Sequence, residues 1–216
     1  MLRAERRLDD WLKSHCPRAA AAYPIPAMRA LRDRIARANP HLSHDFSAQR
    51  RLSLHTALAE HGYDATHVEG AYSEFYAARN EVECYPDALP ALTRLATHFP
   101  LVALTNGNAD VERIGLAHLF RFSLSSRDCG VAKPAPQIFL AACERLGLPP
   151  MSVLHVGDDP DLDVAGARSA GLRTAWINRT GMEWTQPVEP DLALRDLAEL
   201  ANTLAPVNQN PTAALA

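Results

Sequence analysis

The spacing of apolar residues changes character near residue 82. Before that point, apolar positions recur at helical spacing, and no segment alternates in the way of a half-buried strand. We therefore predict an all-helical unit over residues 1–82. Its helices are expected at residues 2–12, 28–38, 47–61 and 66–80, the last of them capped by Thr66.

From residue 83 onward, short apolar runs alternate with helical patterns, which is typical of a parallel sheet with helices on both faces. The predicted fold class is α/β, with a Rossmann-like parallel sheet over residues 83–205 and the helical unit before it. Residues 206–216 have no core pattern and are predicted to form a flexible tail. The strands are expected at residues 101–104, 122–125, 153–156, 174–177 and 191–194, and the helices at 86–98, 109–116, 136–146, 162–170 and 195–204.

A group of carboxylates directly follows the third predicted strand. It comprises Asp158, Asp159, Asp161 and Asp163. Carboxylates gathered at a strand end are costly unless a positive charge lies among them. Mg2+ binds one or two carboxylates together with substrate phosphate, so it is the cation that we expect here.

The four carboxylates need not share one role. Asp158 and Asp163 can point at one cation, and Asp159 can support the metal ligands from behind. Asp161 either caps the following helix or faces water. An acidic, capped start of a helix accounts for one or two of these residues but not for the whole group.

Two further features lie at predicted strand ends, where ligands of open parallel sheets bind. Thr105 and Asn106, just before Gly107, offer a hydroxyl and backbone N–H groups that suit a phosphate oxygen. Lys133, in a rigid loop between small residues and prolines, can neutralise a phosphate or steady a carboxylate nucleophile. Taken singly, the first is more simply a plain Asn-Gly turn, and the second a solvated lysine.

The order of these features resembles the haloacid dehalogenase superfamily of phosphatases. The stretch from Leu104 to Gly107 resembles the second motif of that family, Lys133 in VAKPAPQIF the third, and residues 155–163 the fourth. The helical unit resembles the family's helical cap domain. The segments LTNGN, LHVGDD and RAERRLDDWL are most similar to the branch of flavin-pathway sugar-phosphate phosphatases, which act on 5-amino-6-(5-phosphoribitylamino)uracil and often on flavin mononucleotide.

The resemblance implies a Mg2+-dependent phosphomonoesterase acting on a small phosphorylated metabolite. Thr105 and Asn106 would bind the phosphate, and Lys133 would neutralise its charge, with Thr105 and Lys133 counted as catalytic. Asp158 would ligate Mg2+ directly and Asp163 would position a metal-bound water. Asp159 would act behind these ligands, and the cap would cover the site and select the substrate.

The resemblance also implies an aspartate nucleophile in a DxDxT motif after the first strand, and no residue here can be assigned to it. Asp9 and Asp10 lie in a helical pattern, Asp161 and Asp163 belong to the fourth motif, and the other candidates stand singly: Asp87, Asp110 and Asp128. We expect either that Met1 is an internal or misassigned start, which we favour, or that the chain is a truncated, inactive relative. In both cases two strand edges and an apolar groove should lie open, and the printed chain should be poorly stable or inactive.

Charge and hydropathy narrow the remaining classes. The net charge of −3 does not indicate the basic surface that nucleic-acid-binding proteins have. No apolar run is long enough to span a bilayer. We expect a cytoplasmic protein, a monomer or weak dimer, whose partner is a small-molecule phosphate ester. Two alternatives remain: a non-catalytic, truncated binding protein of the same fold, and a 2-haloacid dehalogenase, which needs no metal and which the acidic fourth motif disfavours.

Overall fold

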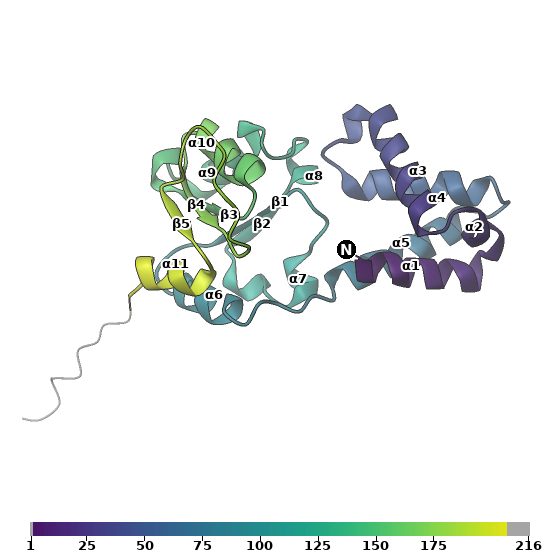
Figure 1. The fold of residues 1–216 in the computed structure, drawn as a ribbon, viewed down its shortest axis with the longest axis horizontal. Helices are drawn as coiled ribbons and strands as arrows, with labels where there is room; N and C mark the ends of the chain where they lie inside the picture. The colour runs from purple at the N-terminus through teal and green to yellow at the C-terminus, as the bar shows by residue number, and fades with distance from the viewer. Residues whose placement is uncertain (1, 207–216) are drawn as a thin grey trace, which may run out of the picture. The chain divides into compact units, whose positions relative to one another are not determined.

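The computed structural model describes residues 2–206, and most of the predicted tail therefore lies outside the described residues. The contacts divide the chain into two compact units (Figure 1). The first comprises residues 1–82, 103–117 and 123–133, and the second comprises residues 83–102, 118–122 and 134–216. The domain limits drawn from the sequence, 1–82 and 83–205, stay a prediction.

The helical part of the first unit forms as its periodicity predicts, with no strand among the described residues before position 82. Its core includes Leu54, Leu58 and Phe75, which are fully buried. Asp64, and not Thr66, caps the fourth predicted helix, because its carboxylate accepts the backbone N–H groups of residues 66 and 67. The elements are α1 (Leu2–His15), α2 (Pro17–Ala22), α3 (Ile25–Ala38), η1 (Pro40–Leu42), α4 (Phe46–Ala59) and α5 (Ala65–Asn80).

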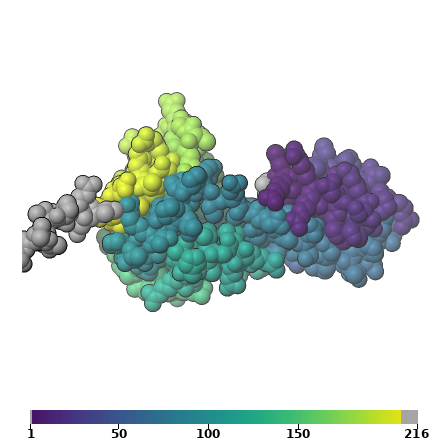
Figure 2. Space-filling model, turned by 90° about the horizontal axis from the view of Figure 1, so that it is seen from below, coloured from purple at the N-terminus to yellow at the C-terminus, as the bar shows by residue number. Residues whose placement is uncertain are grey.

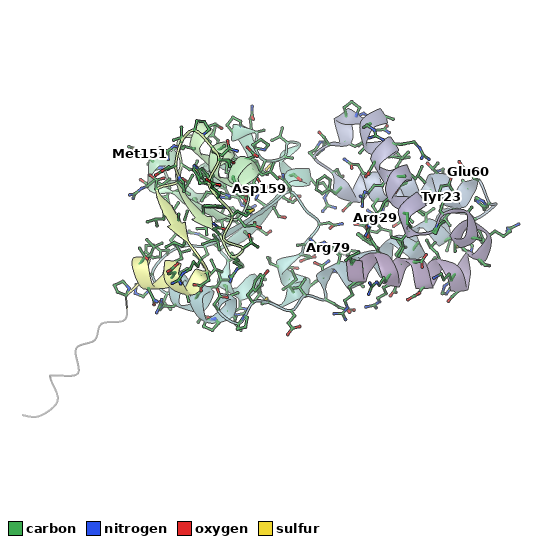
Figure 3. All side chains as sticks on the ribbon, in the orientation of Figure 1. Tyr23, Arg29, Glu60, Arg79, Met151 and Asp159 are labelled. Carbon is green, nitrogen blue, oxygen red and sulfur yellow. The ribbon has the colours of Figure 1, made fainter. Side chains whose placement is uncertain are left out.

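A buried ion cluster joins α1, α3 and α4 inside this unit. Glu5 has only 6% of its side chain exposed, and Arg29 Nε donates to its carboxylate over 2.9 Å. Arg32 lies 3.5 Å from the other carboxylate oxygen. The buried Arg50 stacks on the Phe75 ring, and its burial, aided by Arg32, lowers the pKa of Arg50 to about 10. Figure 3 shows Arg29 inside the helical unit, and it labels Tyr23 and Glu60, which form a hydrogen bond of 2.5 Å.

The rest of the chain alternates strands and helices, as predicted. The α/β class is confirmed. The strands are β1 (Val102–Thr105), β2 (Phe122–Ser125), β3 (Leu154–Gly157), β4 (Arg173–Ile177) and β5 (Leu192–Leu194). The helices are α6 (Ala88–Ala96), α7 (Val111–Ile114), η2 (Ala117–Leu119), α8 (Ser126–Cys129), α9 (Pro136–Leu146), η3 (Pro150–Ser152), η4 (Pro160–Ala165), α10 (Gly166–Ser169) and α11 (Leu197–Leu204).

The described strands form two sheets. One contains β1 and β2, and the other has the order β3-β4-β5 with both pairings parallel. In the second sheet, Leu154 and Val156 of β3 pack with α6 and α11, whereas His155 lies against Phe139 of α9. Figure 1 shows α6 and α11 on one side of this sheet and α9 and α10 on the other, and Figure 2 shows α11, in yellow, beside the blue-green residues of α6. This unit is therefore a three-layer α/β arrangement.

Two helix predictions need correction. The helix expected at residues 109–116 is only the short α7, because Gly115, with a φ of 85°, ends it in a left-handed conformation. The helix expected at residues 162–170 begins earlier, as the π-helical turn η4, and continues as α10. A π-helical turn is rare and often lies at a functional site. No helix within residues 2–206 has the length and apolar character needed to cross a membrane.

An ion pair fastens the start of α6 to α11 and the segment after β4. Arg179 donates to both carboxylate oxygens of Asp87 over 3.0 and 2.8 Å, and the Leu197 backbone N–H donates to the same carboxylate over 2.9 Å. The Arg179 guanidinium, helped by that backbone N–H and opposed by burial, lowers the pKa of Asp87. Asp87 therefore ties three separate segments of the second unit together.

Acid should release this tie. Because the pKa of Asp87 is lower in the folded state, its contribution is present above the unfolded-state pKa and is lost as the pH falls through the folded value. Asp87→Asn should lower the free energy of unfolding by about 2 kcal/mol at pH 7. Urea unfolding at pH 7 and pH 3 checks this. The difference in free energy of unfolding between the parent protein and Asp87→Asn should be smaller at pH 3. An equal gap at both pH values would contradict it.

Candidate active site

The turn with Thr105 and Asn106 meets the Lys133 loop in the first unit. The turn directly follows β1, but the lysine loop does not lie at a strand end as predicted, because α8 separates it from β2. The Asn106 side chain accepts the Lys133 backbone N–H over 2.7 Å and donates to the Lys133 carbonyl over 2.9 Å. The Thr105 hydroxyl accepts the Gly107 N–H over 2.9 Å, which closes the turn after β1. Asn106 therefore fixes the backbone of the lysine loop, as a neighbouring strand would.

Hydrogen bonds tie this turn to the helices of the same unit. The buried Ser126 hydroxyl lies 2.6 Å from the His44 carbonyl oxygen and 3.1 Å from that of Asn106. Farther along, the Asp110 N–H donates to Asn80 over 2.7 Å, and the Tyr76 hydroxyl donates to the Asp110 carboxylate over 3.0 Å. Burial, together with the Asp110 carboxylate, raises the pKa of Tyr76, so its hydroxyl keeps its proton well above neutral pH. The turn is thus held by partly buried hydrogen bonds.

The carboxylate group lies in the second unit, after β3. Asp163 is 5% exposed, and one of its oxygens lies 3.0 Å from His155 Nε2. Its other oxygen accepts the Asp159 N–H over 3.1 Å. The carboxylate packs directly on Gly157, where an added Cβ would lie 2.2 Å from Asp163 Cγ. Only glycine leaves room for Asp163 at this position.

The other carboxylates of this group have separate surroundings. Asp159 caps the turn that follows, because its side chain accepts the N–H groups of residues 161 and 162 over 2.9 and 2.8 Å. The exposed Asp161 accepts from Gln186 over 2.7 Å, so it faces outward and does not cap. Asp158 is exposed directly after β3, and Trp176 Nε1 donates to its carbonyl oxygen over 3.0 Å. The helix cap is thus Asp159.

The donor chemistry of this group suits a hard cation. Within residues 2–206, no three or more His, Cys, Asp or Glu side chains are placed to hold a metal by themselves. Mg2+ is bound by one or two carboxylates with water and substrate phosphate in the other positions, so Asp158 and Asp163 fit its usual ligand set. Thr105, Asn106 and Lys133 belong to one unit and the three aspartates to the other.

The sequence did not predict the supporting roles of three residues near these turns. Ser126 holds the turn after β1, His155 holds Asp163, and Trp176 holds the Asp158 backbone. The role of His155 could have been predicted, because it is the one polar residue in the apolar run of residues 153–156. The role of Ser126 could not have been predicted, since a serine after a strand is most simply interpreted as part of a turn.

Comparison with known proteins assigns the family. The family model for haloacid dehalogenase-like hydrolases matches residues 6–171. The chain belongs to this family. The resemblance seen in the sequence, the α/β fold class and the assignment to an enzyme family of hydrolases are thereby confirmed.

The relatives of this haloacid dehalogenase-like hydrolase include phosphatases. It is 31% identical to 5-amino-6-(5-phospho-D-ribitylamino)uracil phosphatase YigB of Escherichia coli (strain K12), over 94% of this chain and 89% of the relative. It is 34% identical to phosphoserine phosphatase of Thermus thermophilus, over 83% of this chain and 70% of the relative.

A solved structure resembles this hydrolase closely. It is described as 2-haloacid dehalogenase from Pseudomonas syringae pv. Tomato DC3000 and matches with a TM-score of 0.88 and 37% identity, over 94% of this chain and 90% of that one. The similar proteins thus include some that are named as phosphatases and one that is described as a 2-haloacid dehalogenase.

Proposed function

We propose that this hydrolase is a Mg2+-dependent phosphomonoesterase of small phosphorylated metabolites. The observation that carries the proposal is the double hydrogen bond between the Asn106 side chain and the Lys133 backbone. It brings a lysine to a turn that presents a hydroxyl and backbone N–H groups. Cation and N–H donors at one strand end are what a phosphate oxyanion requires.

Each site residue has a role in this proposal. The Asn106 backbone N–H and the Thr105 hydroxyl bind phosphate oxygens, and Lys133 neutralises the charge that develops on them. Asp158, exposed after β3, ligates Mg2+, and Asp163 holds a metal-bound water. Asp159 holds the turn that carries both aspartates. When bound, Mg2+ supplies charge stabilisation at the phosphoryl group.

The E. coli relative supports a finer proposal for the substrate. Its name is that of a phosphatase of 5-amino-6-(5-phospho-D-ribitylamino)uracil, and the match spans most of both chains. We propose a sugar-phosphate ester of this kind, or flavin mononucleotide, as the substrate, with the helices of the first unit selecting it. A cytoplasmic location, and a monomer or weak dimer, complete the proposal.

Phosphate release from p-nitrophenyl phosphate tests the activity. The printed chain and a form extended upstream of Met1 should be assayed side by side, with and without Mg2+. We expect Mg2+-dependent release in the extended form and little in the printed chain, because no nucleophile is assigned in the printed sequence. Equal activity in the two forms would contradict this account.

Variants of the active form test the assigned roles. Lys133→Ala should lower the rate by roughly thirtyfold, and Asp158→Asn should weaken Mg2+ binding by about tenfold. The matched control is Asp161→Asn, because Asp161 lies in the same turn but is exposed and accepts a hydrogen bond from Gln186. A control that lost as much activity as Asp158→Asn would argue against a specific metal ligand.

The Pseudomonas structure favours a second candidate, carbon-halogen hydrolysis. This reaction needs no metal, whereas the aspartates after β3 suit one. Assaying the extended form with 2-chloropropionate and with p-nitrophenyl phosphate, with and without EDTA, separates the two candidates. Halide release that persists in EDTA, without phosphatase activity, would select the dehalogenase.

A further inference from the structure

One arginine of α5 has no partner for its charge inside the protein. Arg79 is half-buried, and its Nε atom is buried and has no hydrogen-bond partner. Among residues 2–206, its guanidinium makes neither a hydrogen bond nor an ion pair. A buried donor that stays unpaired costs free energy, so such a group in a folded protein indicates a partner such as a bound ligand.

Two arginines of α4, in the same unit, are engaged with other side chains. Arg50 lies over the Phe75 ring, and Arg51 pairs with Glu69 over 2.9 Å. Arg79 follows the buried Phe75 by four positions, so it belongs to the inward face of α5 and not to the solvated one. The charges of the first two arginines are used within the unit, whereas the charge of Arg79 is not.

The end of α5 that carries Arg79 lies against the segment that follows the turn at residues 105–107. Tyr76, three residues before Arg79, donates to the Asp110 carboxylate over 3.0 Å. Asn80, the next residue, accepts the Asp110 N–H over 2.7 Å. Figure 3 shows Arg79 at this end of α5. Arg79 and the turn that suits a phosphate oxygen therefore belong to neighbouring segments of the first unit.

The carboxylate of Asp110 is already engaged and leaves the charge of Arg79 unbalanced. One of its oxygens accepts the N–H groups of residues 112 and 113 over 3.0 and 3.3 Å, and the other accepts the Tyr76 hydroxyl. Arg113 lies 3.8 Å from the same carboxylate. A bound anion would therefore supply the partner that residues 2–206 do not.

We propose that Arg79 binds the phosphate group of the substrate, together with the turn at residues 105–107 and Lys133. This inference rests on the proposed function and adds a residue to it. A guanidinium offers parallel N–H donors that match two phosphate oxygens, which a lysine ammonium cannot do. The proposed substrates, a sugar-phosphate ester or flavin mononucleotide, carry their negative charge on the phosphate, so this is the anion that can pair with Arg79.

Binding of inorganic phosphate to the printed chain tests the proposal, because binding needs no nucleophile. Calorimetric titration at constant Mg2+ compares the parent protein with Arg79→Gln and Arg79→Lys. We expect Arg79→Gln to raise the Kd for phosphate about twentyfold, and Arg79→Lys only about threefold, since lysine keeps the charge but not the paired donors. The melting temperature of Arg79→Gln should equal or exceed that of the parent protein, because no contact within the chain is lost.

Arg51→Gln is the matched control for the change in net charge. It removes the same charge from the same unit, but Arg51 is held by Glu69 and lies over the Tyr72 ring. This variant should bind phosphate as the parent protein does. In a double-mutant cycle, Arg79→Gln and Lys133→Ala should be non-additive, because both side chains contact one phosphate.

Several results would overturn the proposal. A parent protein that binds no phosphate would overturn the proposed function and this inference with it, whereas phosphate binding that Arg79→Gln leaves unchanged would overturn the inference alone. An equal loss in Arg51→Gln would show a general effect of charge.

Two further outcomes would assign Arg79 another role and so contradict the inference. A lower melting temperature of Arg79→Gln, with unchanged phosphate binding, would show that the arginine only complements the helix dipole at the end of α5. Weaker binding of 3-phosphoglycerate, without a change for glycerol 3-phosphate or inorganic phosphate, would show that Arg79 binds a carboxylate on the leaving group.

Discussion

Replacing Gly157 with alanine is expected to lower the free energy of unfolding by about 4 kcal/mol, through overpacking and lost hydrogen bonds of Asp163. The added methyl would lie 2.2 to 2.4 Å from three Asp163 atoms, which belong to a buried side chain. The carboxylate would have to leave His155 and the Asp159 N–H. Mg2+ affinity should fall as well, because Asp163 is one of the two proposed metal residues.

Chemical denaturation of the parent and the variant measures the stability change, and Mg2+ titration by calorimetry measures the second effect. Gly107→Ala is the matched control. It also lies in the turn after a strand, but its added Cβ would meet Thr105 Oγ1 at an ordinary 3.4 Å. In a double-mutant cycle, Gly157→Ala should cost much less in an Asp163→Gly background. An unchanged cost there would show that the clash with Asp163 is not the cause.

Neutralising Glu5 should destabilise the helical part of the first unit by about 3 kcal/mol in the variant Glu5→Gln, because the cluster loses its buried carboxylate. The carboxylate lies among Arg29, Arg32 and Arg50. These guanidinium groups, led by Arg29, lower the pKa of Glu5 although burial opposes the shift. Glutamine keeps the shape of the side chain but removes the negative charge beside Arg29 and the buried Arg50, whereas Arg32 keeps its contact with Asp33 over 3.2 Å.

Thermal unfolding followed by circular dichroism near 222 nm measures this loss, since α1 to α5 are helical. Glu69→Gln is the control, because Glu69 pairs with Arg51 at a side chain that is 58% exposed, where an ion pair contributes little. Adding salt should reduce the difference between Glu5→Gln and the parent protein, because salt screens the repulsion among the arginines. A Glu5→Gln variant as stable as the Glu69→Gln control would contradict the prediction.

The sequence predicted the order of elements because the spacing of apolar residues agrees with the prolines and glycines that bound the elements along most of the chain. The helix at residues 136–146 and the strand at residues 122–125 have the expected limits. Pro136 and Gly147 bound that helix, and a proline at the start and a left-handed glycine at the end are strong local signals. The turns at residues 105–107 and 157–163 were found for the same reason, since each follows an apolar run, whereas α8 separates Lys133 from the end of β2.

What the sequence did not predict depends on contacts between distant residues. The cap of α5 is Asp64 and not Thr66, because the helix begins at Ala65 and the Asp64 carboxylate accepts the N–H groups of residues 66 and 67. Both residue types are common caps, so the sequence alone did not distinguish the two starting points. The π-helical turn at residues 160–165 has no composition that distinguishes it from an α-helix. The Asn106 contact with Lys133 joins residues 27 positions apart, so no local pattern could reveal it. The Gly157 contact with Asp163 similarly needs the folded turn.

The clamped Asn106 has a consequence for chemical ageing. Asn-Gly pairs lose ammonia when the glycine nitrogen attacks the side-chain carbonyl carbon and closes a five-membered ring. Here both reacting groups are held in place. The Asn106 side-chain amide makes two hydrogen bonds to the Lys133 backbone, and the Gly107 N–H donates to the Thr105 hydroxyl. The folded protein should therefore keep this asparagine intact far longer than an unfolded chain would. The extent of deamidation at residue 106 would then measure how long a molecule has spent with the hydrogen bonds of the turn at residues 105–107 broken.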